Sequence, residues 1–278
     1  MGKQPFSVLM ACYRGDVPEQ LEASLRSVTT GQTRRPDEVV LVVDGPLPPD
    51  LDAALGAAAA GSPVPVVVHR LPVNGGLGRA LNAGLAVCRN DIVARQDADD
   101  ISRPDRFERQ VAVIEHGADI VGSALTEFSS DPEAPDGVTR VPPLRPEAIR
   151  RDARFHQPFF HPTVVFRRSA VQAVGGYEHV ASLEDYWLFA RMIQAGAVVA
   201  NLPEPLVSYR IGGGAYARRG GARILRSELD LQRRFRRLGF TTRAQFLRNV
   251  ALRGAYRLVP EDLRRTAYRR FLAQRGHR

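Results

Sequence analysis

Three aspartates follow an apolar run in the stretch IVARQDADD, residues 92–100. Side chains two residues apart in an extended chain point to the same side, so Asp97 and Asp99 can converge on one point. A divalent cation relieves their mutual repulsion, and Mg²⁺ or Mn²⁺ prefers oxygen ligands and keeps positions open for phosphate oxygens. The pattern therefore favours a site for a metal ion and a phosphorylated ligand over a solvated turn. Asp100 is interpreted as a structural residue that shapes the turn after the strand.

Other polar residues follow predicted strands, and each has a functional and a structural interpretation. Asp44 ends the run EVVLVV and either accepts a hydrogen bond from a ribose or a base, or simply forms a turn with Gly45. Tyr13 follows the run FSVLMAC and either stacks on a base or packs against the protein. Arg79, in NGGLGRALNAG, is a candidate phosphate ligand near a helix N-terminus, or part of a solvated helix face. Leu81 stands where a dinucleotide-binding loop needs its third Gly or Ala, so that motif is not matched.

Two further candidates lie in the second half of the chain. Glu184 and Asp185 precede the apolar pattern YWLFARMIQAG. Acids at a helix start are common because of the helix dipole, but one that faces a ligand can act as a general base. His161, in FFHPTVVF, either contacts a phosphate or an acceptor, or is a structural histidine. The sequence contains no HExxH motif and no P-loop.

The first half of the chain alternates strand and helix patterns. Strand patterns cover residues 6–12, 38–43, 64–70, 91–95 and 119–125, and helix patterns cover residues 17–29, 75–88 and 102–117. Asp16 and Ser102 are the expected caps of the first and third helices, and Pro65 favours an edge strand. These units predict a doubly wound, mostly parallel α/β sheet. Ligands bind at the carboxyl ends of such strands, where the polar residues lie.

The C-terminal part of the chain is strongly basic. A polar, proline-rich loop is expected at 129–146, and helices are expected at 224–238, 243–256 and 261–274. The net charge is +9, yet residues 218–278 alone hold 18 Arg against four acidic residues, a local +14. This segment therefore either binds an anionic membrane surface or is a solvated arginine-rich surface. No nucleic-acid partner is expected, because only this segment suggests one.

Composition limits the class of protein. The chain has 278 residues, 44% of them hydrophobic, which suits one large domain with or without an appendage. Two cysteines, Cys12 and Cys88, form neither a disulfide framework nor a zinc motif. We expect no signal peptide, no membrane-spanning helix, and a location in the cytoplasm or peripheral on the inner face of the plasma membrane.

In combination and in this order, the motifs resemble the family 2 glycosyltransferases, which are inverting enzymes with the GT-A fold. The resemblance covers about residues 5–215 and is closest to bacterial members that build exopolysaccharide, capsule or lipopolysaccharide. The motifs that carry it are FSVLMACYRGD, DEVVLVVDGPL, NGGLGRALNAGL, ARQDADDISRPDR, HPTVVFRRSAV, GGYE, LEDYWLFARM and EPLVSYRIGGG. The family also implies roles for particular residues: Ala11, Tyr13, Asp44 and Asp97 for the nucleotide, Asp99 for Mg²⁺ or Mn²⁺, and Asp185 as catalytic base.

The resemblance further implies a donor, an acceptor and a division of the chain. The expected donor is a nucleotide sugar of the UDP-hexose class, and the expected acceptor is a glycan or a lipid-linked glycan. One sugar is expected per encounter, because the QxxRW motif of processive members is absent. Residues 1–221 would form the catalytic domain, with a nucleotide half at about 1–125 and an acceptor half at about 150–221; residues 222–278 would form a basic helical extension.

Some residues depart from the family pattern or have only a general role. Val43 replaces the first of two acids that often precede Gly45 in the family. Residues 211–221 are expected to form a mobile lid, in which Arg218 or Arg219 meets the phosphates. Glu184 and His161 remain candidates for acceptor or phosphate contacts. The alternatives are a sugar nucleotidyltransferase and a non-catalytic nucleotide- or carbohydrate-binding module.

Overall fold

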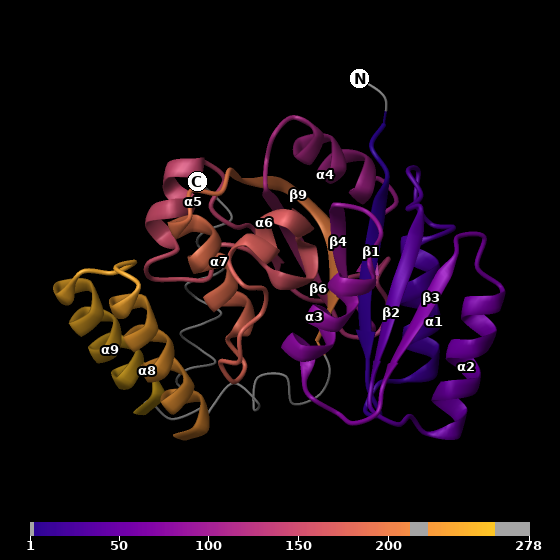
Figure 1. Ribbon diagram of the computed structural model, residues 1–278, viewed down its shortest axis with the longest axis horizontal. Helices are drawn as coiled ribbons and strands as arrows, with labels where there is room; N and C mark the ends of the chain where they lie inside the picture. Colours follow the sequence, from indigo (N-terminus) through magenta and orange to yellow (C-terminus); the bar gives the residue numbers. More distant parts are fainter. Residues whose placement is uncertain (1–2, 212–221, 259–278) are drawn as a thin grey trace.

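A mixed, mostly parallel β-sheet forms the centre of the molecule. The computed structural model describes residues 3–211 and 222–258 (Figure 1). Within these ranges the sheet has nine strands in the order β3-β2-β1-β4-β8-β6-β9-β5, with β7 paired to β6. The strands are β1 (Phe6–Cys12), β2 (Glu38–Asp44), β3 (Val66–Leu71), β4 (Ile92–Asp97), β5 (Ile101–Ser102), β6 (Ile120–Phe128), β7 (Thr139–Arg140), β8 (Val165–Arg167) and β9 (Val199–Arg210).

The first four strands have the parallel arrangement that the sequence predicts. β1 lies between β2 and β4, β3 is the edge strand after Pro65 as expected, and all these pairs are parallel. Every residue of β2 is buried, because helices cover both faces and its apolar side chains meet them. The covering helices are α1 (Pro18–Val28), α2 (Pro49–Ala60), α3 (Leu77–Val87) and α4 (Arg106–Glu115).

The starts of two helices differ from the prediction. Helix α1 is preceded by Val17, and Asp16 instead accepts a hydrogen bond from the backbone N–H of Tyr13, at 2.9 Å. Ser102 lies in β5, where its hydroxyl donates to Gln96 at 2.8 Å, so it cannot cap α4. Both predicted caps are therefore wrong, because hydrogen bonds to Tyr13 and to Gln96 occupy these side chains.

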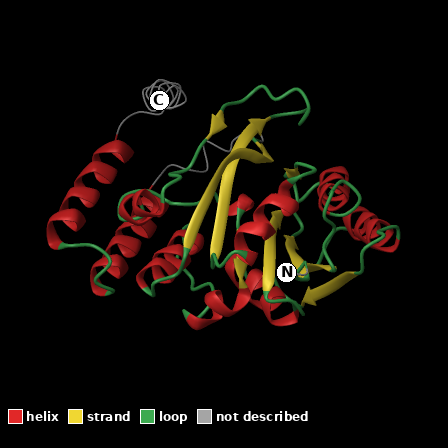
Figure 2. Cartoon of the chain, turned by 90° about the horizontal axis from the view of Figure 1, so that it is seen from above, coloured by secondary structure: helices red, strands yellow, loops and turns green. Residues whose placement is uncertain are grey.

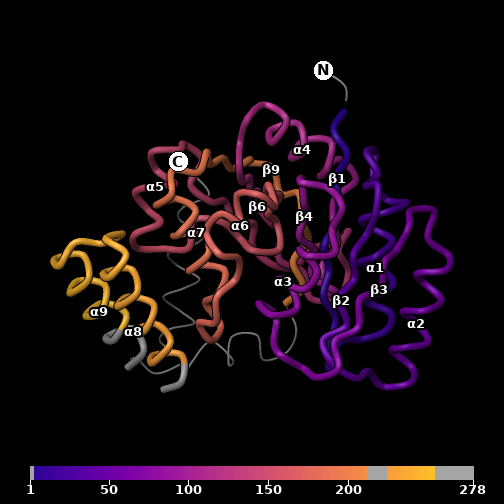
Figure 3. Tube along the Cα trace, viewed as in Figure 1, coloured from indigo at the N-terminus to yellow at the C-terminus, as the bar shows by residue number. Residues whose placement is uncertain are grey.

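The second half of the chain extends the sheet with antiparallel pairs. β8 is antiparallel to both β4 and β6, whereas β6 and β9 are parallel. The remaining helices before residue 211 are α5 (Pro146–Asp152), the 3₁₀ turn η1 (His161–Thr163), α6 (Arg168–Ala173) and α7 (Glu184–Gln194). Viewed from above, the strands lie in the middle with helices on both sides (Figure 2), and β1–β3 lie on the side of the molecule that carries α2, away from α7 (Figure 3).

Helices α8 (Ala222–Arg237) and α9 (Arg243–Leu258) form a hairpin at the end of the molecule opposite α2 (Figures 1 and 2). Leu231 and Phe235 of α8 are fully buried, and the Phe235 ring meets that of Tyr186 in α7 edge to face, with centroids 5.1 Å apart. The hairpin therefore shares a hydrophobic core with α7. The predicted division between residues 221 and 222 stays a prediction, and the helix expected at 261–274 lies outside the described residues.

In the part of the chain that the structure describes, no helix has the length and apolar character needed to cross a bilayer.

Candidate active site

The carboxyl ends of β1, β2 and β4 bring the predicted nucleotide residues to one rim of the sheet. Ala11 is paired with Asp97 across the β1–β4 ladder. Tyr13 follows directly and is 47% exposed, so its ring is available to a ligand. The turn after it is closed by Asp16, whose N–H donates to the Tyr13 carbonyl at 3.0 Å. Burial raises the pKa of Asp16 to about 6, with Asp99 and Asp97 adding to the shift.

Asp44 is buried and holds the loop that opens α3. Its carboxylate accepts hydrogen bonds from the backbone N–H groups of Gly75 at 2.7 Å and Gly76 at 2.9 Å. The Asn74 amide donates to the Asp44 carbonyl at 3.0 Å. The structure thus gives Asp44 a positioning role, and its contact with a base or ribose stays a prediction. Arg79 follows this loop on the exposed first turn of α3.

Asp97, Asp99 and Asp100, which we call the acidic cluster, converge as predicted, and Asp100 takes part. One carboxyl oxygen of each residue lies within 4.8 Å of the others. Asp100 is fully buried, its Oδ1 accepts the N–H of Arg210 at 2.8 Å, and its Oδ2 has no hydrogen-bond partner among the described residues. Burial raises the pKa of Asp99 and, more strongly, that of Asp100, and the neighbouring aspartates add to both shifts. Three convergent carboxylates with an unpaired buried oxygen fit a hard divalent cation.

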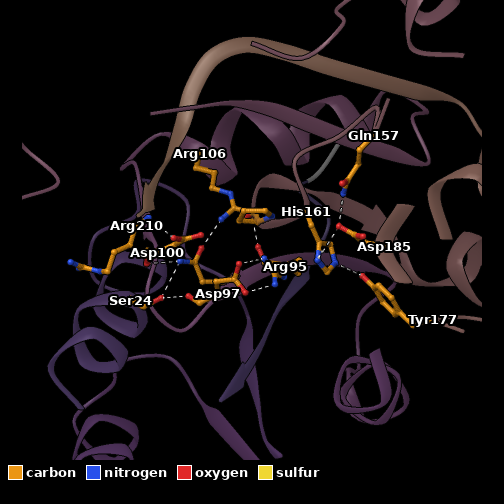
Figure 4. A network of polar contacts seen from close by, with 12 residues as sticks. Ser24, Arg95, Asp97, Asp100, Arg106, Gln157, His161, Tyr177, Asp185 and Arg210 are labelled. Carbon is orange, nitrogen blue, oxygen red and sulfur yellow. Dashed lines mark hydrogen bonds and ion pairs between the residues drawn. The ribbon is translucent and has the colours of Figure 1, made fainter. Parts of the chain in front are cut away.

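Arg95 connects the acidic cluster with the opposite side of the site (Figure 4). Its side chain is 3% exposed, and its guanidinium forms an ion pair with both carboxyl oxygens of Asp97. Behind it, Arg106 is completely buried and donates to the Arg95 carbonyl at 2.7 Å and to Gln96 at 2.7 Å. Burial, together with the charge of Arg95, lowers the pKa of Arg106 to about 9. Two buried cations thus support the acidic cluster from the protein side.

Arg210, the last residue of β9, closes the site from the other edge. Its Nε donates to the Asp99 carbonyl at 3.0 Å, and its guanidinium lies 4.4 Å from the centre of the Phe128 ring. The predicted lid begins one residue later. Arg218 and Arg219 lie outside the described residues, so their contacts with phosphate stay predictions.

Asp185 lies in the first turn of α7, beside Glu184. Its Oδ1 accepts the N–H of Tyr186 at 2.7 Å, and its Oδ2 accepts a hydrogen bond from the side-chain amide of Gln157. Burial raises the pKa of Asp185 to about 6, and the charge of Glu184 adds to the shift. A carboxylate that is held in place and has a raised pKa suits a general base near neutral pH.

His161 lies next to Asp185, as Figure 4 shows, and bonds to Tyr177. Its Nε2 is 2.9 Å from the Tyr177 hydroxyl, and its Nδ1 is 3.9 Å from Asp185 Oδ2. Burial and the charge of Arg95 lower the pKa of His161 well below its usual value, so the ring is neutral and forms no ion pair with Asp185. Gln157, His161, Tyr177 and Asp185 together are called the base cluster below.

The sequence did not single out Arg95, Gln157, Tyr177 or Arg210. Arg95 carried a usable signal, because it is two residues before Asp97 in a strand and therefore on the same side. Gln157 and Tyr177 carried none, since they reach the site only through the folding of loops around η1 and α7.

Comparisons with known proteins agree with this arrangement. The family described as "Glycosyl transferase family 2" matches residues 7–175. An uncharacterized glycosyltransferase of Haemophilus influenzae is 39% identical over 96% of this chain and 98% of its own length. The amylovoran biosynthesis glycosyltransferase AmsE of Erwinia amylovora is 41% identical over 82% of this chain and 84% of its own length. An Escherichia coli UDP-Gal:α-D-GlcNAc-diphosphoundecaprenol β-1,3-galactosyltransferase is 33% identical, covering 96% of each chain.

Solved structures share the fold at low sequence identity. The mannosyltransferase PcManGT from Pyrobaculum calidifontis, solved with GDP-Man and Mn²⁺, has a TM-score of 0.67 and 17% identity over 100% of this chain and 76% of its own. S. aureus TarS 1–349, solved with UDP-GlcNAc, has a TM-score of 0.62 and 16% identity, covering 82% of this chain and 65% of its own. The expected GT-A-like fold is thus confirmed, and the chain belongs to glycosyl transferase family 2.

Proposed function

We propose that this protein transfers one sugar, with inversion, from a UDP-hexose to a hydroxyl of a lipid-linked glycan during assembly of a cell-surface polysaccharide. The observation that carries the proposal is the placement of the acidic cluster and Asp185 on two sides of Arg95 (Figure 4). Arg95 pairs with Asp97 and also acts electrostatically on Asp185, so both groups face one site. A phosphate-binding cluster beside a general base suits transfer from a sugar diphosphate to a hydroxyl.

The acidic cluster would hold Mg²⁺ or Mn²⁺, with Asp99 as the main ligand. When bound, such an ion offsets the negative charge that develops on a leaving nucleoside diphosphate. Ala11 and Tyr13 would line the base pocket, and Asp44 would keep the α3 loop in position. Arg79, exposed on the first turn of α3, is placed to meet an anionic group at that helix N-terminus.

Asp185 would take the proton of the attacking hydroxyl. Its pKa of about 6 leaves it mostly ionised at neutral pH, yet more basic than an ordinary aspartate. The hydroxyl oxygen bonds to the anomeric carbon as the bond to the diphosphate oxygen breaks, and the electron pair leaves with the nucleoside diphosphate. Attack from the face opposite the leaving group inverts the configuration in a single displacement.

The donor and acceptor follow from the relatives. The E. coli relative, by its name, uses UDP-Gal and GlcNAc-diphosphoundecaprenol, and it matches 96% of this chain. We therefore infer a UDP-hexose donor, with UDP-Gal the first to test, and an acceptor sugar carried on a lipid diphosphate. The basic hairpin α8–α9, packed against the helix that carries Asp185, would face the anionic membrane surface that holds such an acceptor.

A donor screen with a synthetic acceptor tests the proposal. A panel of nucleotide sugars is measured by calorimetry with Mn²⁺, Mg²⁺ or EDTA, and Asp99→Ala is the control. GlcNAc-diphosphate bearing an undecyl chain then serves as acceptor, and NMR gives the anomeric configuration of the product. We expect metal-dependent binding of a UDP-hexose, release of UDP and an inverted linkage. Binding without release of UDP would indicate a binding module. Formation of UTP and hexose 1-phosphate from the UDP-hexose and added inorganic diphosphate would indicate a nucleotidyltransferase.

A further inference from the structure

Two polar atoms of Asp185 and His161 face each other, and each can form a further hydrogen bond. Asp185 Oδ2 and His161 Nδ1 are 3.9 Å apart, which is too far for a hydrogen bond. Oδ2 accepts one bond from Gln157 and keeps a second lone-pair direction. Nδ1 has no hydrogen-bond partner within residues 3–211 and 222–258. The side chains of Asp185 and His161 are 17% and 8% exposed, so neither is completely enclosed by the protein, and the 3.9 Å separation is called the gap below.

Tyr177 determines which ring nitrogen of His161 carries the proton. The Tyr177 hydroxyl is buried, and its hydrogen-bond partner is His161 Nε2 at 2.9 Å. His161 Nε2 is the one hydrogen-bond partner of this hydroxyl among the described residues. Because buried hydroxyls are hydrogen-bonded, the Tyr177 O–H must donate to Nε2. The neutral imidazole therefore carries its proton on Nδ1, on the side of Asp185.

The opposite tautomer would leave two groups unsatisfied. If Nε2–H donated to the Tyr177 oxygen, the hydroxyl proton of Tyr177 would have no acceptor in the described structure. Nδ1 would then direct a lone pair toward the carboxylate of Asp185, so that two acceptors faced each other. The Nδ1–H tautomer removes both conflicts, and it places one donor and one acceptor on the two sides of the gap.

We propose that the acceptor hydroxyl binds in this gap, between Asp185 Oδ2 and His161 Nδ1. His161 is then a catalytic residue, and Tyr177 is its positioning residue. An oxygen about 2.8 Å from both atoms fits this separation. The hydroxyl proton would point to Asp185 Oδ2, and one oxygen lone pair would accept the Nδ1–H of His161. The second lone pair is then directed to the anomeric carbon. The proton passes to Asp185, while His161 keeps its own proton throughout. This inference rests on the proposed transferase function.

A matched pair of substitutions tests the role of Nδ1. His161→Asn keeps an amide N–H near the position of Nδ1, whereas His161→Gln keeps one near Nε2. With UDP-Gal, Mn²⁺ and undecyl-linked GlcNAc-diphosphate, we expect kcat to fall about 100-fold in His161→Gln and less than about 10-fold in His161→Asn. Donor affinity and thermal unfolding should stay close to wild type in both variants. Equal losses in the two variants, or no loss in either, would overturn the role of His161.

Nitrogen-15 NMR of the histidine rings tests the role of Tyr177 without any acceptor. We expect the His161 ring to show the Nδ1–H tautomer in the wild type and a mixture of tautomers in Tyr177→Phe. The other histidine signals report whether this variant is folded. An Nε2–H tautomer in the wild type would overturn the assignment, and so would an unchanged tautomer in Tyr177→Phe.

Asp185→Asn, assayed in parallel, separates this inference from the proposed function. If Asp185→Asn transfers sugar at the wild-type rate, the proposed function fails whatever His161 does. If Asp185→Asn is inactive while His161→Gln transfers normally, only the binding of the hydroxyl in the gap fails.

Discussion

The acidic cluster and the base cluster differ in their charge, although they lie in one site. The acidic cluster gathers three carboxylates and offsets them with Arg95 on the protein side, while Asp100 keeps an unpaired oxygen. The base cluster has one acid, Asp185, surrounded by the neutral groups of Gln157, His161 and Tyr177. The acidic cluster suits an anionic ligand that binds together with a metal cation. The base cluster suits an uncharged hydroxyl group. We infer from this difference that the acidic cluster binds the donor and that the base cluster binds the acceptor.

Removal of Arg95 should have the largest effect on stability. Arg95→Met leaves Asp97, whose side chain is 27% exposed, without its cation beside two other carboxylates, and loss of one partner of a mostly buried ion pair costs up to about 3–5 kcal/mol. Urea denaturation measures the change in the free energy of unfolding. Arg95→Lys keeps the charge but not the paired contact, so its loss should be smaller. If Arg95→Met is as stable as the wild type, the acidic cluster does not depend on this charge.

Asp185 should lower stability at neutral pH, in contrast to an acid held by a salt bridge. Burial raises its pKa from 3.8 to about 6, so the folded protein keeps this proton longer than the unfolded chain. The protonated carboxyl of Asp185 stabilises the folded state relative to the unfolded chain, and this stabilisation is lost as the pH rises from about 4 to about 6. Asp185→Asn should be more stable than the wild type by about 1–3 kcal/mol at pH 7.5, and the gain should shrink at pH 5. Denaturation at the two pH values measures this, and an equal gain at both would contradict it.

The same shift predicts how turnover depends on pH. The kcat of the wild type should fall below about pH 6, because protonated Asp185 cannot accept a proton. Glu184→Gln should move this midpoint to lower pH, since Glu184 contributes to raising the pKa of Asp185. Steady-state assays between pH 5 and pH 8 give both midpoints. A midpoint that Glu184→Gln leaves unchanged would show that another group limits turnover.

We propose that the hairpin α8–α9 lies against an anionic membrane surface, and the effect expected from changing its surface is the smallest. Deletion of the hairpin would expose the core around Phe235, so surface substitutions are the cleaner test. Arg233, Arg237 and Arg243 are exposed, and each basic group contributes about 1 kcal/mol near an anionic leaflet. Their replacement by Glu should reduce sedimentation with anionic liposomes but leave turnover of a short-chain acceptor unchanged. Equal sedimentation of both proteins would remove the membrane role of this hairpin.

The sequence predicted most of the sheet and part of the site. The β1 strand matches its predicted range of residues 6–12, because a short apolar run bounded by polar residues has few alternatives. Asp97 and Asp99 converge as expected, although β4 ends at Asp97 and Asp99 lies in the turn that follows it. Such patterns depend only on a few neighbouring residues, so they can be recognised in the sequence without knowledge of the fold.

Contacts between distant segments could not be predicted in the same way. Ser102 was expected to cap a helix, but its backbone N–H donates to the Ser27 hydroxyl, 75 residues earlier, at 3.1 Å, and α4 begins only at Arg106. Gln157 reaches Asp185 across 28 residues, and no sequence pattern marks this pair. The base cluster is therefore largely a product of tertiary structure, whereas the acidic cluster comes from one short stretch of sequence, the end of β4 and the turn after it.

The central claim is that donor binding and proton transfer belong to separate clusters, and a paired measurement tests it most directly. Affinity for UDP-Gal with Mn²⁺, measured by calorimetry, and kcat are determined for Asp99→Asn and Asp185→Asn. We predict that Asp99→Asn weakens metal-dependent donor binding at least about 10-fold, whereas Asp185→Asn binds the donor normally and loses about 10²–10⁴-fold in kcat. Normal donor binding in Asp99→Asn, or lost donor binding in Asp185→Asn, would contradict the division of the site.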